Sequence, residues 1–71
     1  MDMATVGEAA GQIWQYLQTS GVQSLPQLQR GTHLPERLLH MGIGWLARED
    51  KLVFVQTQRG LTLGVRGESS A

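Results

Sequence analysis

Apolar residues recur at spacings of three and four between residues 34 and 51, which is the period of an amphipathic helix. With successive residues placed 100° apart, Leu39, Ile43 and Leu46 fall on one side of this segment. The opposite side carries Arg37, His40, Met41, Gly44, Arg48 and Lys51. The pattern predicts the longest helix of the chain, with one face in a core and a mildly basic face turned outward.

The ends of this helix and its two glycines lead to further expectations. Pro35 suits the first turn, where a helix needs no N–H, and Asp50 is expected to end the helix in a left-handed conformation. Gly42 and Gly44 each cost about 1 kcal/mol relative to Ala inside a helix. Something must therefore pack closely against these glycines, or the helix is locally weak.

A first helix is predicted from Thr5, whose spacing to Glu8 is that of a capping box, to a C-cap at Gly21. Apolar residues recur along it at helical spacing from Val6 to Leu17. Its Gly7-x-x-x-Gly11 pair would let the second helix or the hairpin approach.

A second helix is predicted between these two. Residues 22–23 form a stub of strand, and Ser24 and Gln27 again have capping-box spacing, so this helix starts there and ends at Gly31. A tight turn over residues 32–34 then leads into the helix of residues 34–51. Two helices joined by such a turn form a helix-turn-helix.

After Asp50 the period changes to that of strands. Residues 52–55 are β-branched, aromatic or Leu, residues 57–60 read as a turn, and residues 61–65 alternate apolar and small or polar positions. The two strands are expected to pair as a hairpin, with Leu52 and Phe54 facing the helices. The expected core consists of Ala10, Ile13, Trp14, Leu17, Leu25, Leu28, Leu39, Ile43, Leu46, Leu52, Phe54 and Leu63.

This order of elements is that of a winged helix-turn-helix, an α+β fold with a three-helix core and a C-terminal two-stranded β-hairpin wing. The chain is expected to be one domain over residues 1–71, ordered over about 5–65, with a frayed tail at 66–71. The runs AGQIW and GWLAREDK resemble a family of small stand-alone bacterial winged-helix proteins of unknown function, over Val6 to about Val65. Pro35 departs from that family's usual small polar cap. The resemblance implies the fold and a DNA-binding class, and no established ligand.

Charge and composition narrow the function classes. The 71 residues carry zero formal net charge, which argues against strong general attraction to nucleic acid, although all six Lys and Arg fall between Arg30 and Arg66. Without cysteine, neither a disulfide nor a thiolate zinc site can form. No leader and no bilayer-length apolar run is present, so a soluble cytoplasmic protein is expected, with no membrane partner.

Two functional interpretations remain open. In the first, the helix of residues 34–51 enters the major groove of double-stranded DNA, with Arg37 nearest the bases. The proposed contacts to DNA are Arg30, Arg37, His40, Arg48, Lys51 and Arg59. Against base readout, the middle of this face offers no Asn or Gln to adenine, and an equally good interpretation is that its charges only keep the surface hydrated.

In the second interpretation, the domain binds a protein partner through Met41, Gly44, Val53 and Val55. Val53 and Val55 would lie on the uncovered face of the wing beside an open strand edge, which predicts weak homodimerisation through that face or edge.

An enzyme is not expected, because no nucleophile with a base, phosphate loop or paired carboxylates can be found. No cofactor is expected either. His33 and His40 stand seven residues apart without a third ligand, so no metal site is expected. Trp14 and Trp45 fall beside Leu and Ile at helical spacing and are expected to pack in the core.

Overall fold

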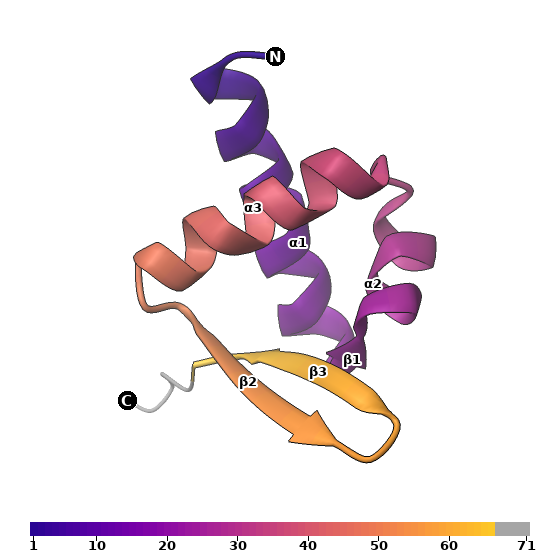
Figure 1. The fold of residues 1–71 in the computed structure, drawn as a ribbon. Coiled ribbons are helices and arrows are strands. Elements are labelled where there is room, and N and C mark those ends of the chain that lie inside the picture. The colour runs from indigo at the N-terminus through magenta and orange to yellow at the C-terminus, as the bar shows by residue number, and fades with distance from the viewer. Residues whose placement is uncertain (67–71) are drawn as a thin grey trace.

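The computed structural model describes residues 1–66, which form three helices and a three-stranded antiparallel sheet (Figure 1). The elements follow in the order α1 (Met3–Ser20), β1 (Gln23–Ser24), α2 (Leu25–Thr32), α3 (Glu36–Arg48), β2 (Leu52–Thr57) and β3 (Gly60–Val65). The predicted α+β order is confirmed. The longest helix is α1, with 18 residues against 13 in α3, so that expectation was wrong.

Helix α1 begins two residues before the expected cap. Asp2 is the N-cap, and its carboxylate accepts hydrogen bonds from the Thr5 N–H at 2.9 Å and the Thr5 hydroxyl at 2.8 Å. The predicted capping box of Thr5 and Glu8 was therefore wrong, because Thr5 lies inside the first turn. Gly21 caps the other end, as predicted, with φ 80° and a bond from its N–H to the Leu17 carbonyl.

The cap makes the start of α1 sensitive to pH. The backbone bond from Thr5, followed by its hydroxyl bond, lowers the pKa of Asp2 below the usual value of about 3.9. A lowered pKa contributes stability that is fully present above about pH 3.9 and is lost as the pH falls through the folded-state pKa. Amide signals of the first turn should shift in that acidic range in an NMR titration. In Asp2→Asn this transition should be absent, and its persistence would contradict the assigned cap.

Helix α2 starts as predicted and ends later. Ser24 accepts a bond from the Gln27 N–H at 3.3 Å, and the Gln27 side chain accepts one from the Ser24 N–H at 2.9 Å, so the capping box is confirmed. The helix does not stop at Gly31. It continues to Thr32 and is capped by His33 with a left-handed φ of 61°. Gly31 serves packing instead, since a Cβ there would lie 2.2 Å from Cζ of Tyr16 on α1.

Helix α3 is shorter at both ends than the 34–51 segment. Pro35 occupies the N-cap without a side-chain hydrogen bond, and its carbonyl accepts from the Leu39 N–H at 2.9 Å. After the helix, Asp50 adopts the predicted left-handed conformation with φ 62°. The Lys51 N–H returns to the Leu46 carbonyl at 3.0 Å, which turns the chain into β2.

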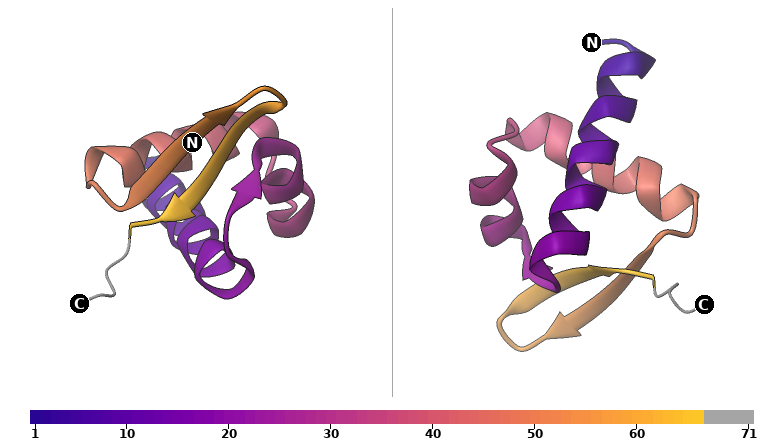
Figure 2. Two further views of the ribbon diagram at one scale, coloured as in Figure 1. Left: turned by 90° about the horizontal axis from the view of Figure 1, so that it is seen from below. Right: turned by 180° about the vertical axis from the view of Figure 1, so that it is seen from behind.

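The core lies where α3 crosses α1, above the sheet (Figures 1 and 2). Ile13, Leu17, Leu28, Leu39 and Leu63 are its most completely buried side chains. Trp14, Leu25 and Trp45 pack against this core while staying partly exposed, so their predicted packing is confirmed but their full burial is not. Val6 and Ala9 are also buried, although the expected core did not include them.

The glycines of the helices divide into two kinds. A Cβ on Gly42 would lie 2.7 Å from Cδ1 of Ile13 and 3.2 Å from the backbone nitrogen of Ala10, so α1 approaches α3 at this point. Gly7 faces the Trp45 ring on α3, not the second helix or the hairpin as expected. Among residues 1–66, no atom beyond the neighbouring backbone of the same helix lies within 4 Å of a Cβ on Gly11 or Gly44. The expected close packing therefore holds for Gly42 alone of the two glycines in α3.

The wing belongs to a larger sheet than the predicted two strands. The strand order is β1-β3-β2, because β1 pairs with β3 through Gln23 and Leu63 and through Ser24 and Thr62. The predicted hairpin of β2 and β3 is confirmed, with Gln58 and Arg59 in its turn. Beyond the end of β3, the Arg66 N–H donates to the Lys51 carbonyl at 2.9 Å, which adds one hydrogen bond to the ladder. The rest of the predicted tail, residues 67–71, lies outside the described residues.

Phe54 was wrongly predicted to lie in the core, since 45% of its surface is exposed. Its partner Leu63 on the middle strand is completely buried. Helices α1 and α2 both pack against β3, whereas β2 is at the edge of the sheet and only its first residue, Leu52, is buried. The alternation of side chains was therefore interpreted correctly, but the helices do not reach as far along β2 as Phe54.

Candidate nucleic-acid interface

The outward face of α3 is open over its whole length. Arg37, Met41 and Gly44 are exposed, as are His40 and Arg48, while Leu39, Gly42, Ile43 and Leu46 on the other face are buried. Helix α1 covers only that inner face: α3 crosses in front of α1 in Figure 1, and α1 lies in front when the molecule is viewed from behind in Figure 2. The face predicted from the 3.6-residue period is thus accessible to a macromolecule.

The cations of this region differ in whether a carboxylate neutralises them. Lys51 lies 3.4 Å from Glu49, and Arg66 lies 3.5 Å from Asp50, with all four side chains largely exposed. No other ion pair within 4.0 Å is formed among residues 1–66, so Arg30, Arg37, Arg48 and Arg59 have no carboxylate partner there. Exposed pairs contribute only about 0–1 kcal/mol, so Lys51 can also exchange Glu49 for another anion.

The six candidate residues for DNA contact do not form one cluster. Arg30 in the last turn of α2 and Arg37 in the first turn of α3 flank the same turn. Arg48 lies at the other end of α3, about 16 Å from Arg37 at 1.5 Å per residue. Arg59 lies in the hairpin turn, which Figure 1 shows on the α2 side of the molecule, away from the end of α3. The structure therefore spreads positive charge along α3 and adds one charge at the hairpin.

The hairpin tip forms a cleft with the start of α2 that was not expected from the sequence. Its volume is about 290 Å³. The cleft is lined by Ser24, Leu25, Pro26, Thr57, Arg59, Gly60, Leu61 and Thr62. Sequence reasoning missed it because the pairing of β1 with β3, which draws the hairpin beside α2, depends on residues 23 and 24 meeting residues 62 and 63.

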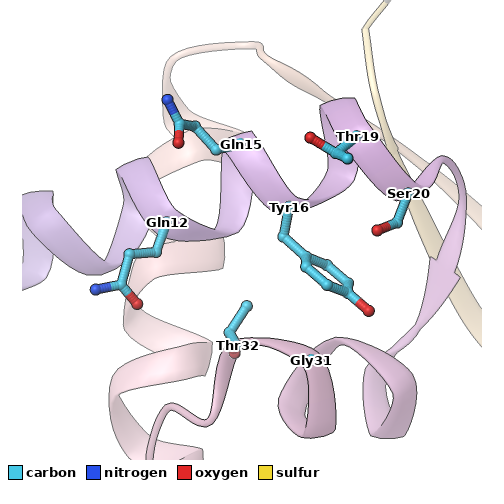
Figure 3. Close-up of a pocket in the computed structure, with 7 residues that line it drawn as sticks. All are labelled: Gln12, Gln15, Tyr16, Thr19, Ser20, Gly31 and Thr32. Carbon is cyan, nitrogen blue, oxygen red and sulfur yellow. The ribbon is translucent and has the colours of Figure 1, made fainter.

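A broader groove of about 410 Å³ runs between α1 and α2 (Figure 3). It is lined by Gln12, Gln15, Tyr16, Thr19, Ser20, Gly31 and Thr32. Figure 3 shows the Tyr16 ring pointing from α1 toward α2, over Gly31. The Thr32 hydroxyl donates to the Leu28 carbonyl at 2.9 Å. Hydroxyl and amide groups can exchange hydrogen bonds with a ligand, and the described lining contains no Asp, Glu, Lys, Arg or His.

The candidate residues for protein interaction fall into two separate places. Met41 and Gly44 lie on α3, with 46% of Met41 exposed, and Val53 and Val55 lie on β2, 40% and 49% exposed. Phe54 lies between these valines in the strand and is similarly exposed, but its side chain points to the opposite face of the sheet, the face of its partner Leu63. The sequence analysis missed the exposure of Phe54 because the residue had been assigned to the core.

Neither a cluster of metal ligands nor a membrane-spanning helix is found in the part of the chain that the structure describes. Over residues 1–66 no three His, Cys, Asp or Glu side chains lie close enough together to hold a metal ion. His33 caps α2 and His40 is exposed on α3. No helix in the same range combines the length and the apolar character needed to cross a membrane.

Helices α2 and α3 form a helix-turn-helix in which α3 has an open outward face. The β2–β3 hairpin follows α3 and pairs with β1, the short strand that precedes α2. This arrangement defines the winged helix-turn-helix class. The chain belongs to the family described as winged helix-turn-helix domain (DUF2582), whose sequence profile matches residues 1–64. The resemblance inferred from AGQIW and GWLAREDK is thereby confirmed.

Two relatives agree with this assignment. The uncharacterized protein MJ1608 of Methanocaldococcus jannaschii is 37% identical over 57 residues, covering 76% of this chain and 80% of its own. The solution NMR structure of protein BT2368 from Bacteroides thetaiotaomicron is similar with a TM-score of 0.84 and 33% identity. That match covers 94% of this chain and 82% of the other.

Proposed function

We propose that this chain is a weak DNA-binding module, an accessory regulator in which α3 lies in the major groove and the β2–β3 hairpin lies on the backbone. The observation that supports this best is the open outward face of α3, on which Arg37 and Arg48 are exposed and have no carboxylate partner among residues 1–66. Such a helix fits a groove about 12 Å wide.

Each candidate residue has a separate role in this proposal. Arg37 lies nearest the bases, because helix-turn-helix proteins read bases with the first turns of the recognition helix. Phosphate contacts are assigned to Arg30, His40, Arg48, Lys51 and Arg59. Since Met41 and Gly44 occupy the middle of the face, few base-specific hydrogen bonds can form and sequence preference should be slight.

The salt dependence of binding tests the proposal. With three to five phosphate contacts, the logarithm of the binding constant should fall with the logarithm of salt concentration with a slope of roughly −3 to −5. Binding at physiological salt should then be near the micromolar range or weaker. An NMR titration with a short duplex at low salt should shift amides of α3 and the hairpin. Shifts confined to other elements would reject the proposal.

Arg37→Ala and Arg59→Ala should each weaken binding and reduce the salt slope by up to about 1. The matched control is Arg66→Ala, which removes the same charge from the end of the ladder, outside the proposed interface. Equal losses in all three variants would mean that only total charge matters, and would contradict docking through α3 and the hairpin.

A second candidate function is a protein-interaction module that does not bind nucleic acid. The exposed apolar side chains of Val53, Phe54 and Val55, together with the zero net charge, favour it. Affinity purification from the source cells with and without nuclease separates the two functions. Partners lost on nuclease treatment indicate nucleic acid, whereas partners retained after it indicate direct protein contact.

A further inference from the structure

Strand β2 has a regular edge that no other described element pairs with. In the strand order β1-β3-β2, which residues 1–66 form, β2 has β3 as its one neighbour. The view from below in Figure 2 shows β1 and β2 on opposite sides of β3. The pairing runs without a break from Leu52 opposite Val65 to Thr57 opposite Gly60, so no bulge disturbs the edge.

The backbone groups on this edge can be assigned from the ladder. In an antiparallel pair, residues bonded to the neighbour alternate with residues whose N–H and C=O point away from it. The Arg66 N–H bonds to the Lys51 carbonyl, so Lys51 and every second residue after it face β3. Leu52, Phe54 and Gln56 therefore direct their N–H and C=O groups outward.

Within residues 1–66, this edge lacks the usual features that prevent pairing. Soluble proteins protect such edges with charged side chains, prolines, bulges or covering elements. Residues 52–57, LVFVQT, contain no charge and no proline. All of them except Leu52 are exposed. The side chains on either side of this edge are mainly apolar, and 40–49% of Val53, Phe54 and Val55 is exposed.

We propose that β2 pairs antiparallel with β2 of a second copy of this chain, about a two-fold axis at Phe54, to form a continuous six-stranded sheet. A two-fold interface brings the same patch of both copies together. With the two-fold axis at Phe54, all three outward residues of each copy lie opposite outward residues of the other copy. Phe54 faces Phe54, Leu52 faces Gln56, and Val53 faces Val55 across a non-hydrogen-bonded pair.

In this register, the charges of the two copies do not oppose pairing. The chain has zero formal net charge, so two copies do not repel each other as a whole. Lys51 comes opposite Thr57, and Arg59 at the tip of one copy approaches the Glu49–Lys51 segment of the other, which carries two carboxylates and one ammonium group. No like charges face each other across the paired strands. The short contact places this dimer among weak, transient associations.

Sedimentation equilibrium measures the association directly. The wild-type chain should dimerise at high micromolar to millimolar concentration. Phe54→Pro removes an outward N–H without removing a bond to β3, and edge strands tolerate proline in that orientation. This variant should raise the dimer dissociation constant at least tenfold. The matched control, Met41→Gln on α3, alters a side chain of similar exposure without changing the net charge and should leave the constant unchanged.

Disulfide trapping tests the register, and it still tests the proposal if the Phe54→Pro variant fails to fold. The chain has no cysteine, so each introduced thiol is unique. Facing non-hydrogen-bonded residues have Cα atoms about 4.5 Å apart, within disulfide range. In a mixture of Val53→Cys and Val55→Cys chains in a glutathione buffer, the mixed disulfide should form in preference to either homodimer. A wild-type monomer at millimolar concentration, or equal trapping of all three species, would overturn the proposal. The proposed dimer does not depend on DNA binding.

Discussion

Ile13→Ala is expected to destabilise the domain by roughly 2–5 kcal/mol, the range for removing a large aliphatic side chain from a closed core. Ile13 is completely buried where α1 crosses α3, and its Cδ1 lies beside Gly42. A chain of 71 residues is expected to have stability near the lower end of the usual range, about 5 kcal/mol. The variant should therefore retain only about 0–3 kcal/mol of stability, and urea unfolding followed by circular dichroism should show a clearly lower transition midpoint.

The matched control for this variant is Phe54→Ala. Phe54 is larger than Ile13 and was expected from the sequence to lie in the core, yet 45% of it is exposed. Its removal should cost only about 1 kcal/mol, through lost cross-strand contact with Leu63 and lower β propensity. A loss from Phe54→Ala as large as that from Ile13→Ala would mean that the helices cover β2 further than described.

Gly42→Ala and Gly44→Ala are expected to change stability in opposite directions. At Gly42 the added methyl group would meet Ile13 and the backbone of Ala10, and overpacking of this kind typically costs about 1–3 kcal/mol. The helix propensity of Ala offsets up to about 1 kcal/mol of that cost. At Gly44 no other described segment lies within 4 Å of the added methyl group, so only the propensity gain remains, up to about 1 kcal/mol.

Urea unfolding of the two variants in parallel measures this difference, because both replace a glycine in the middle of α3 and the two positions differ only in their surroundings. Stabilisation by both substitutions would show that α1 and α3 can separate slightly at Gly42 at no cost. Gly44→Ala also places a methyl group on the proposed DNA-binding face, so its affinity for a short duplex can be measured on the same sample.

The local elements of this fold could be predicted from the sequence because short-range physical chemistry determines them. The period of Leu39, Ile43 and Leu46 defines the buried face of α3, the capping box of Ser24 and Gln27 starts α2, and the left-handed tolerance of Asp50 ends the helical segment. Each depends on residues within one or two turns of each other. The outward face of α3, which carries most of the candidate site, was identified for the same reason.

Contacts between distant segments could be determined only by the tertiary structure. Pairing of Gln23 and Ser24 with β3 turns a two-residue stub into a third strand and brings the hairpin tip beside α2. The need for glycine at positions 31 and 42 comes from Tyr16, Ile13 and Ala10 on another helix, which no local rule includes. Alternation along β2 correctly grouped Leu52 with Phe54, but how far along that face the helices extend depends on their lengths and packing. Burial therefore ends at Leu52, and the surface around Phe54 remains available for another chain.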